Sequence, residues 1–154
     1  MLYLNRSYRT SVEIMIEANK ELNKLGLSPA NNVVRHGEEV EFESNNDVSI
    51  ISKQLKILNS KYNTTAIICK DDFELKTASE KLSDLHLKVV SEDNAYYGDE
   101  KNLLLTIQTA KGLEFDSVII YDKNSYSEND IDLKQLYVAK TRALHKLVIC
   151  TSEK

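Results

Sequence analysis

The chain has 154 residues, of which 42% are hydrophobic and 29% charged, so it can bury a sizeable core and has the composition of a soluble globular protein. No apolar run approaches the roughly 20 residues of a membrane-spanning helix, and the first residues lack the pattern of a signal peptide. We therefore predict a single cytoplasmic domain over residues 1–154, with no membrane partner. The net charge of −4 argues against a dedicated nucleic-acid coat protein.

A helix is the first clear element of the chain. It is expected over residues 10–26, with Thr10 and Glu13 as a capping box at its start and Gly26 as its stop. Its helical period predicts an inner face made of Val12, Met15, Ile16, Leu22 and Leu25.

Apolar runs and amphipathic segments then alternate to the end of the chain. The first expected elements are two short strands within 31–44 that turn at His36-Gly37 and a helix over 47–62 with Ile51, Leu55 and Leu58 inside. A strand at 64–70 follows, then a helix at 72–85 capped by Asp71 or Asp72, and then strands at 87–90, 102–108 and 117–121. A helix at 132–144 and a strand at 146–152 complete the order. This order predicts an α/β fold, a mainly parallel sheet with helices on both faces. In such folds, loops at the carboxyl ends of the strands form the site.

The two cysteines, Cys69 and Cys150, each follow an apolar strand-like run. Buried, reduced thiols fit that setting better than a disulfide does. The three histidines are scattered without the spacing of metal ligands, so no metal site is predicted.

The stretch "NRSYRTS" places Arg9 directly before the expected helix start at Thr10. A cation at the positive end of a helix is unfavourable by up to about 1 kcal/mol, unless an anion shares the site. A phosphate would make the placement favourable, because the helix N-terminus and the guanidinium would both face it. Tyr8 could offer a flat face to a base. The simpler alternative is a solvated arginine and a tyrosine at the edge of the core.

The stretch "YVAKTRAL" places Arg142 near the end of a helix whose inner face is expected to hold Leu133, Leu136, Tyr137 and Leu144. A cation in a last helical turn complements the helix dipole, which is a complete structural explanation. Alternatively, a rigid helix could present Arg142 to a phosphoryl group, as arginine fingers do.

The stretch "TIQTAKGLEF" links two predicted strands. Thr106, Gln108 and Thr109 could donate to phosphate oxygens, Gly112 permits a positive φ or a close backbone approach, and Glu114 could accept from a sugar hydroxyl. The alternative is an irregular connection with a Lys-Gly turn. The chain has no G-x-x-x-x-G-K-[ST] loop and no acidic Mg²⁺ pair after a strand, so it lacks the parts to handle phosphates alone.

Together and in this order, the three stretches resemble the second RecA-like motor domain of superfamily 1 helicases of the UvrD/Rep type. "SYRTS", within 5–11, looks like motif IV, "TAKGLEFDSVII", within 106–120, like motif V, and "QLYVAKTRALHKLVI", at 135–149, like motif VI. The middle of the chain matches only in its alternating pattern. UvrD and Rep insert a large extra subdomain before motif V, whereas this chain has only "SEDNAYYGDEKN" in that region. In this respect the chain looks closer to the HelD-like branch, in which relatives act on RNA polymerase.

The resemblance implies a role for each residue singled out above. At the nucleotide, Tyr8 stacks on the adenine, Arg9 and Arg142 contact the γ-phosphate as the catalytic arginines, and Gly112 and Glu114 belong to the same site, with Glu114 at the ribose. Single-stranded DNA is contacted by Thr106, Gln108 and Thr109. Two residues depart from the family pattern. Gln108 stands where many relatives carry a histidine, and Lys140 replaces the small apolar residue usual before "TRA".

These roles predict the carboxyl-terminal motor half of an ATP-dependent DNA helicase or translocase. The cofactor would be ATP with Mg²⁺, whose ligands come from the N-terminal RecA-like domain of the same parent protein, so the chain alone would be inactive. One alternative is a non-catalytic module that binds a protein such as RNA polymerase. Another is a stand-alone nucleic-acid binder, which the pI of about 5.4 disfavours.

Overall fold

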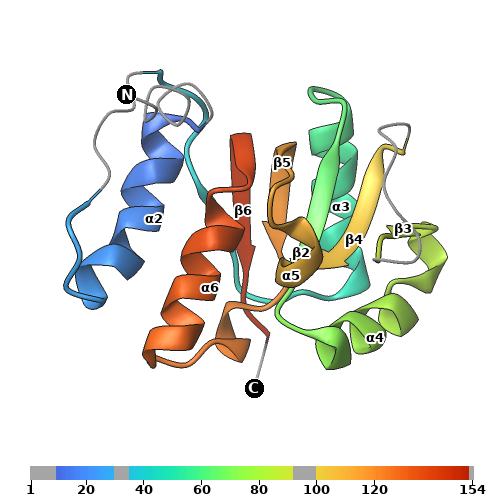
Figure 1. The fold of residues 1–154 in the computed structure, drawn as a ribbon. Helices are drawn as coiled ribbons and strands as arrows, with labels where there is room; N and C mark the ends of the chain where they lie inside the picture. Colours follow the sequence, from blue (N-terminus) through green and yellow to red (C-terminus); the bar gives the residue numbers. More distant parts are fainter. Residues whose placement is uncertain (1–9, 30–34, 92–99, 153–154) are drawn as a thin grey trace.

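The structure is a computed structural model that describes residues 10–29, 35–91 and 100–152. Helices and strands alternate along these ranges (Figure 1). In chain order they are α2 (Val12–Lys24), β1 (Glu41–Glu43), α3 (Val48–Asn59), β2 (Thr65–Cys69), α4 (Asp72–Lys81), the 3₁₀ turn η1 (Ser83–Leu85), β3 (Lys88–Val89), β4 (Asn102–Thr106), α5 (Ile107–Ala110), β5 (Phe115–Ile120), the 3₁₀ turn η2 (Lys123–Ser125), α6 (Asp130–Lys140) and β6 (Ala143–Cys150).

The strands form one six-stranded sheet in the order β1-β6-β5-β2-β4-β3. Each neighbouring pair is parallel, which confirms the predicted α/β fold. Because the strands are parallel, their carboxyl ends share one edge of the sheet and their amino ends the opposite edge. We call these the carboxyl edge and the amino edge. The carboxyl edge lies toward α4 in Figure 1.

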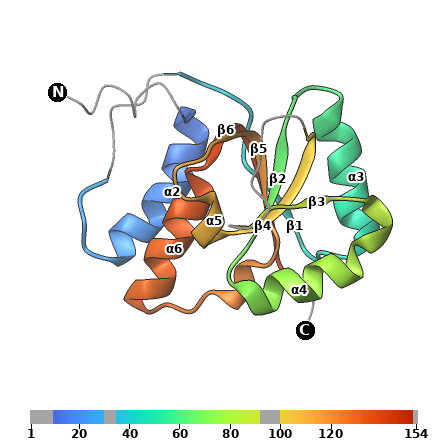
Figure 2. The same ribbon diagram turned by 45° about the vertical axis from the view of Figure 1, so that its right-hand side comes forward.

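Alternate residues of the central strands feed two apolar cores, one on each face of the sheet. Ile67 of β2 lies in register with Leu104 and Ile119, and all three pack toward α3 and α4. The adjacent residue, Ile68, contributes to the core under α2, α5 and α6. Figure 2 shows these two helical layers on opposite sides of the sheet. The prediction that Ile51, Leu55 and Leu58 face inward from α3 is confirmed.

Helix α2 is rotated relative to the predicted face. Its stop is as predicted, because Gly26 adopts a left-handed φ of 77° and Leu27 N donates to Leu22 O at 2.9 Å. Its start is not, because Ser11 rather than Thr10 caps the helix by accepting from Ile14 N. Ile16, expected inside, is 62% exposed, while Ile14 and Ala18 are buried instead. The two glutamates Glu17 and Glu21 are also buried, which no apolar periodicity predicts.

Two other predictions can be compared with the structure. The described part of 31–44 holds one strand, β1, which pairs in parallel with β6, while the first strand predicted before His36-Gly37 lies mostly outside the described residues. Strand β4 ends at Thr106 rather than Gln108, because the Thr106 hydroxyl accepts from Thr109 N and starts the short helix α5. The predicted cap of α4 is confirmed, since Asp71 accepts from Glu74 N at 2.9 Å.

Within the described ranges, no helix combines the length and apolar character that crossing a bilayer requires. Both cysteines are free and buried, as predicted.

Candidate functional site

Arg142 lies in the two-residue link between α6 and β6, at the amino edge of the sheet. The sequence predicted a helix up to Leu144, but α6 ends at Lys140 and β6 begins at Ala143. The helix ends earlier than its sequence pattern predicts because the chain pairs with β5 instead: Phe115 N at the start of β5 donates to Arg142 O at 2.9 Å. The side chain of Arg142 therefore starts from the edge of the sheet.

The Arg142 guanidinium joins the end of α6 to the turn before β5. Nε donates to Val138 O at 3.1 Å, Nη1 to Leu113 O at 3.2 Å and Nη2 to Thr141 Oγ1 at 3.3 Å. Val138 O is among the last carbonyls of α6, which have no intrahelical partner, so the helix-end role considered for Arg142 is present in the structure. The bond to Leu113 O adds something the helix alone does not explain, because it ties the two motif-like stretches together.

Gly112 and Glu114 flank Leu113 in sequence and are thereby brought to the same edge as Arg142. Gly112 has a left-handed φ of 82°, and a Cβ there would meet nothing within 4 Å, so this glycine is required by backbone conformation and not by crowding. It is exposed, and Glu114 is half-buried. Three of the predicted nucleotide-site residues thus gather on one side of the sheet.

The start of α2 reaches the same place. The buried Thr10 hydroxyl lies 3.4 Å from Thr141 O and 3.2 Å from Ala143 O, the carbonyls on either side of Arg142. Thr10 is therefore a link to the arginine segment and not the helix cap that the sequence predicted. Tyr8 and Arg9, the other predicted nucleotide contacts, lie outside the described residues.

The predicted DNA-contacting residues begin at the opposite edge, where β4 ends, and continue into α5. Thr106 ends β4 at the carboxyl edge and is 4% exposed, with its hydroxyl donating to Thr109 Oγ1 at 3.3 Å. Gln108 is exposed and Thr109 half-buried. Thr106 therefore shapes the local turn, while Gln108 is the member of the trio whose side chain is open to an incoming ligand.

Thr106 and the amino-edge residues are separated by about the length of the central strands, roughly 17–20 Å for five or six residues. Gln108 and Thr109 lie in α5, on the stretch that runs back along one face of the sheet toward Gly112 (Figure 1). The sequence placed the three stretches at strand or helix ends and expected the site in loops at the carboxyl ends of the strands. Thr106 lies at that edge, and Arg142 lies just past a helix end as expected, but Gly112, Glu114 and Arg142 are at the amino edge of the sheet. The reason is that the connection from β4 crosses β2 and enters β5 from its amino end.

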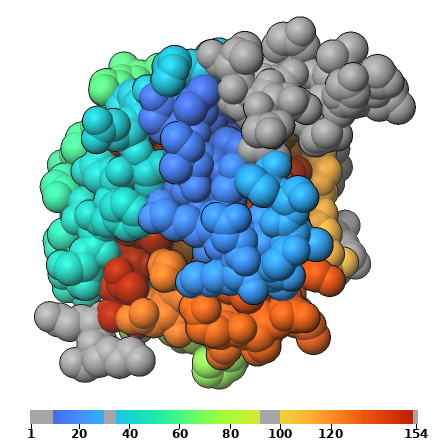
Figure 3. Space-filling model, turned by 90° about the vertical axis from the view of Figure 1, so that its left-hand side faces the viewer, coloured from blue at the N-terminus to red at the C-terminus, as the bar shows by residue number. Residues whose placement is uncertain are grey.

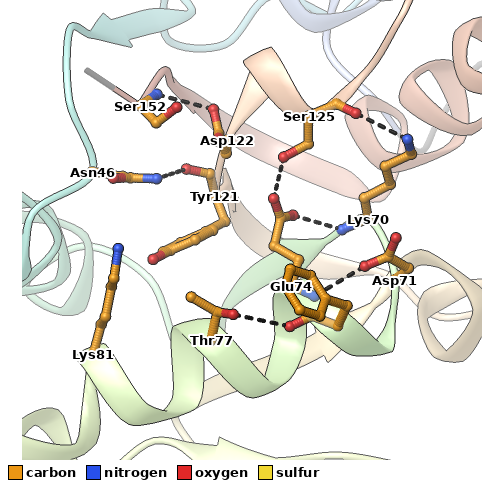
Figure 4. Close-up of a pocket in the computed structure, with 11 residues that line it drawn as sticks. Asn46, Lys70, Asp71, Glu74, Thr77, Lys81, Tyr121, Asp122, Ser125 and Ser152 are labelled. Atoms are coloured by element: carbon orange, nitrogen blue, oxygen red, sulfur yellow. Dashed lines mark hydrogen bonds between the residues drawn. The ribbon is translucent and has the colours of Figure 1, made fainter. Parts of the chain in front are cut away.

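A separate cavity of about 410 Å³ lies at the carboxyl edge, where β2 and β5 end (Figure 4). Glu74 of α4 dominates its interior, accepting from Lys70 N at 2.8 Å and from the Ser125 hydroxyl. Burial raises the pKa of this carboxyl, although the Ser125 hydrogen bond opposes the shift. A carboxylate thus occupies the start of α4, where an anion would otherwise bind, so the cavity does not supply the phosphate site that the chain lacks.

No three acidic, histidine or cysteine side chains come together to hold a metal ion in the part of the chain that the structure describes. Sequence reasoning also missed Thr10 and the Leu113 carbonyl as members of the amino-edge cluster. Nothing in their local patterns marks them, because both act through contacts distant in sequence.

The fold and the amino-edge cluster define the class of this molecule as a RecA-like α/β domain. In structure it resembles the C-terminal domain of a possible DNA helicase from Lactobacillus plantarum WCFS1, with a TM-score of 0.70, 23% identity, and coverage of 94% of this chain and 87% of that one.

Residues 102–150 match the UvrD-like helicase C-terminal domain family, and they contain both the motif V and the motif VI stretch. The resemblance drawn from the sequence is confirmed over this segment. The chain is also 43% identical over 56 residues to a mimivirus protein (Acanthamoeba polyphaga mimivirus) named "Putative ATP-dependent DNA helicase R568". That match covers 31% of this chain and only 8% of the viral protein's length.

Proposed function

We propose that this chain is the C-terminal motor half of an ATP-dependent DNA helicase or translocase. The observation that carries the proposal is the hydrogen bond from Arg142 to Leu113 O, which gathers the motif VI arginine, Gly112 and Glu114 at the amino edge. An ATP-binding half docked against this edge would meet the three residues together. The proposal adds Tyr8 at the adenine and Arg9 at the γ-phosphate from the sequence resemblance alone.

Arg142 would stabilise negative charge on the transferring phosphoryl group. In the structure its guanidinium is held by two backbone carbonyls and a hydroxyl. A phosphate is a stronger acceptor, because hydrogen bonds to ionised groups are roughly twice as strong as those between neutral groups. Approach of the other half would therefore draw the guanidinium toward phosphate, while the rigid end of α6 fixes where it starts.

The phosphate-cradling loop and the Mg²⁺ carboxylates would come from the N-terminal RecA-like domain of the same parent protein. Thr106 at the far edge, with Gln108 and Thr109 in the following helix α5, would contact single-stranded DNA. Since residues 106–114 form one short continuous stretch that contains both the DNA-contacting residues and Gly112 and Glu114, a shift of one group would displace the other. That connection would couple nucleotide turnover to the grip on the strand.

The test is an Arg142→Ala variant of the full-length parent protein. We expect ATP turnover to fall by roughly 10³-fold or more, the scale of arginine-finger effects, while the affinity for single-stranded DNA largely survives. Lys134→Ala is the matched control, since Lys134 is an exposed cation on the same helix. Normal turnover in Arg142→Ala would reject the role of Arg142 and leave a binding module for a protein partner, such as RNA polymerase, as the better account.

A further inference from the structure

Lys140, the last residue of α6, is completely buried although it carries a charge. Its ammonium lies 3.0 Å from Glu17 Oε2, 2.8 Å from Glu21 Oε1 and 3.4 Å from Glu17 O. A lysine ammonium has three N–H donors, so these three acceptors satisfy it fully. We call Lys140, Glu17 and Glu21 the buried triad.

The charges of the buried triad are closely balanced. Lys20, at the surface of α2, holds the second oxygen of Glu17 at 2.8 Å, so two cations face two carboxylates. Burial raises the pKa of Glu17, but hydrogen bonds from Lys20 and Lys140 outweigh it and keep the pKa below its usual value. Figure 3 shows the residues of α2, in blue, at the surface on this side of the molecule.

We propose that Lys140 is a positioning residue that, through Glu17 and Glu21, fixes the end of α6 against α2 and so sets the place of Arg142. This inference rests on the proposed role of Arg142 in ATP turnover. Apolar residues of similar volume could hold two helices together at least as well as a buried ion triad. A triad differs from them in being directional, and that property is what positioning requires.

The spacing of the triad supports this use. Glu17 and Glu21 are one helical turn apart and both bind the same ammonium, so sliding α2 along α6 by a turn, about 5.4 Å, would leave a buried charge unpaired. The triad therefore fixes the register of the two helices. An interface of Ile14 and Ala18 alone would resist such a slip much less.

The position of the triad also favours a link to Arg142. Lys140 precedes Arg142 by two residues, and Thr10 at the start of α2 lies against the carbonyls on both sides of Arg142. Helix α2 thus holds the arginine segment at two places, through Thr10 and through the triad. With both in place, the Arg142 backbone has one defined position relative to the amino edge.

The test compares two variants of the full-length parent protein, each of which replaces a group of charged residues with neutral ones. The first is the triple variant Lys140→Met/Glu17→Met/Glu21→Met, which replaces all three charged side chains with apolar ones of similar volume, so its unfolding midpoint is expected to stay near wild type. The control is Lys24→Met/Glu128→Gln, which removes an exposed ion pair of the same helix, 3.1 Å apart. Hydrogen exchange of the peptide covering 138–145 and steady-state ATP turnover are measured for both.

A positioning role predicts faster hydrogen exchange at 138–145 in the triple variant. It also predicts a kcat at least about 10-fold lower, with KM for ATP changed by less than about 3-fold, because small misplacements of a catalytic group act mainly on the transition state. The control should match wild type in both readouts. If the triple variant fails to fold, Glu21→Gln replaces it, with a kcat loss of about 3-fold expected.

Wild-type kcat in a stable triple variant, or in a folded Glu21→Gln variant, would overturn the positioning role. Arg142→Ala measured alongside keeps the two claims apart. A large loss in Arg142→Ala with normal kcat in the triple variant rejects positioning alone, whereas unchanged turnover in Arg142→Ala rejects the proposed function. In the second case, unchanged exchange at 138–145 in the triple variant would reject the fixing of the Arg142 segment as well.

Discussion

Removing Lys140 alone should destabilise the fold severely, because it leaves two carboxylates in a place that excludes water. In Lys140→Met, Glu21 would keep a side chain that is 2% exposed and Glu17 one that is 8% exposed. Breaking a buried ion pair by removing one partner costs about 3–5 kcal/mol. Glu17 retains Lys20, so Glu21 should account for most of the loss. Against a typical stability of about 5–15 kcal/mol, this is about a fifth of the total or more.

The assay is urea denaturation of the chain followed by circular dichroism. With a slope of about 2 kcal/mol/M, the midpoint of Lys140→Met should fall by roughly 1.5–2.5 M. Lys24→Met, which breaks only an exposed pair, should cost less than about 1 kcal/mol. Adding Glu17→Met and Glu21→Met to Lys140→Met should restore most of the loss. A midpoint within about 0.5 M of wild type in the single variant would refute the buried ion triad.

Two further predictions concern titration and thiol chemistry. Hydrogen bonds from Gly37 N and His36 lower the pKa of Glu13 from 4.5 to about 2, so this carboxylate stabilises the fold above pH 4.5, and its contribution is lost as the pH falls toward 2. Glu13→Gln should flatten the unfolding midpoint against pH in that window, and parallel curves for variant and wild type would contradict the assignment. Burial raises the pKa of the Cys150 thiol to about 12 and that of the Cys69 thiol further. Strand β5 lies between the strands that carry the two cysteines, so their Cα atoms are roughly 9–10 Å apart, too far for a disulfide. Ellman's reagent at pH 8 should therefore release almost no colour from the native chain and two equivalents in denaturant, and prompt release without denaturant would disprove the burial.

The sheet could be predicted from the sequence because its strands are near-continuous apolar runs, a pattern that only a strand buried on both faces requires. Residues 64–70 are the clearest example, and β2 occupies Thr65–Cys69. Boundaries were less predictable where two patterns compete. The stretch from Lys140 to Leu144 continues a helical period, but pairing of β6 with β5 ends the helix first.

The rotation of α2 was not predictable from its own residues. Its pattern offers two possible inner faces, and Lys140 of α6 selects the one that carries Glu17 and Glu21. A buried charge becomes favourable only when its partners are in place, and those partners are more than 100 residues away. A hint was available in the sequence, since Leu133, Leu136 and Lys140 share one helical face.

The amino-edge cluster was half predictable. The residue types of Gly112, Glu114 and Arg142 are enough to suggest a phosphate or sugar contact. Their meeting depends on the path by which the chain crosses from β4 to β5, and no local pattern encodes that path. The hydrogen bond between Arg142 and Leu113 O is the contact that resolves it.

The central claim is that this chain works as one half of a two-part motor. The most direct measurement is the mass of the native product in the source cell, by immunoblot with an antibody raised against residues 10–152. The account predicts a band several-fold larger than the 17.6 kDa of this chain, with the phosphate-binding half upstream in the same polypeptide. A band at 17.6 kDa would contradict it and favour a stand-alone binding module.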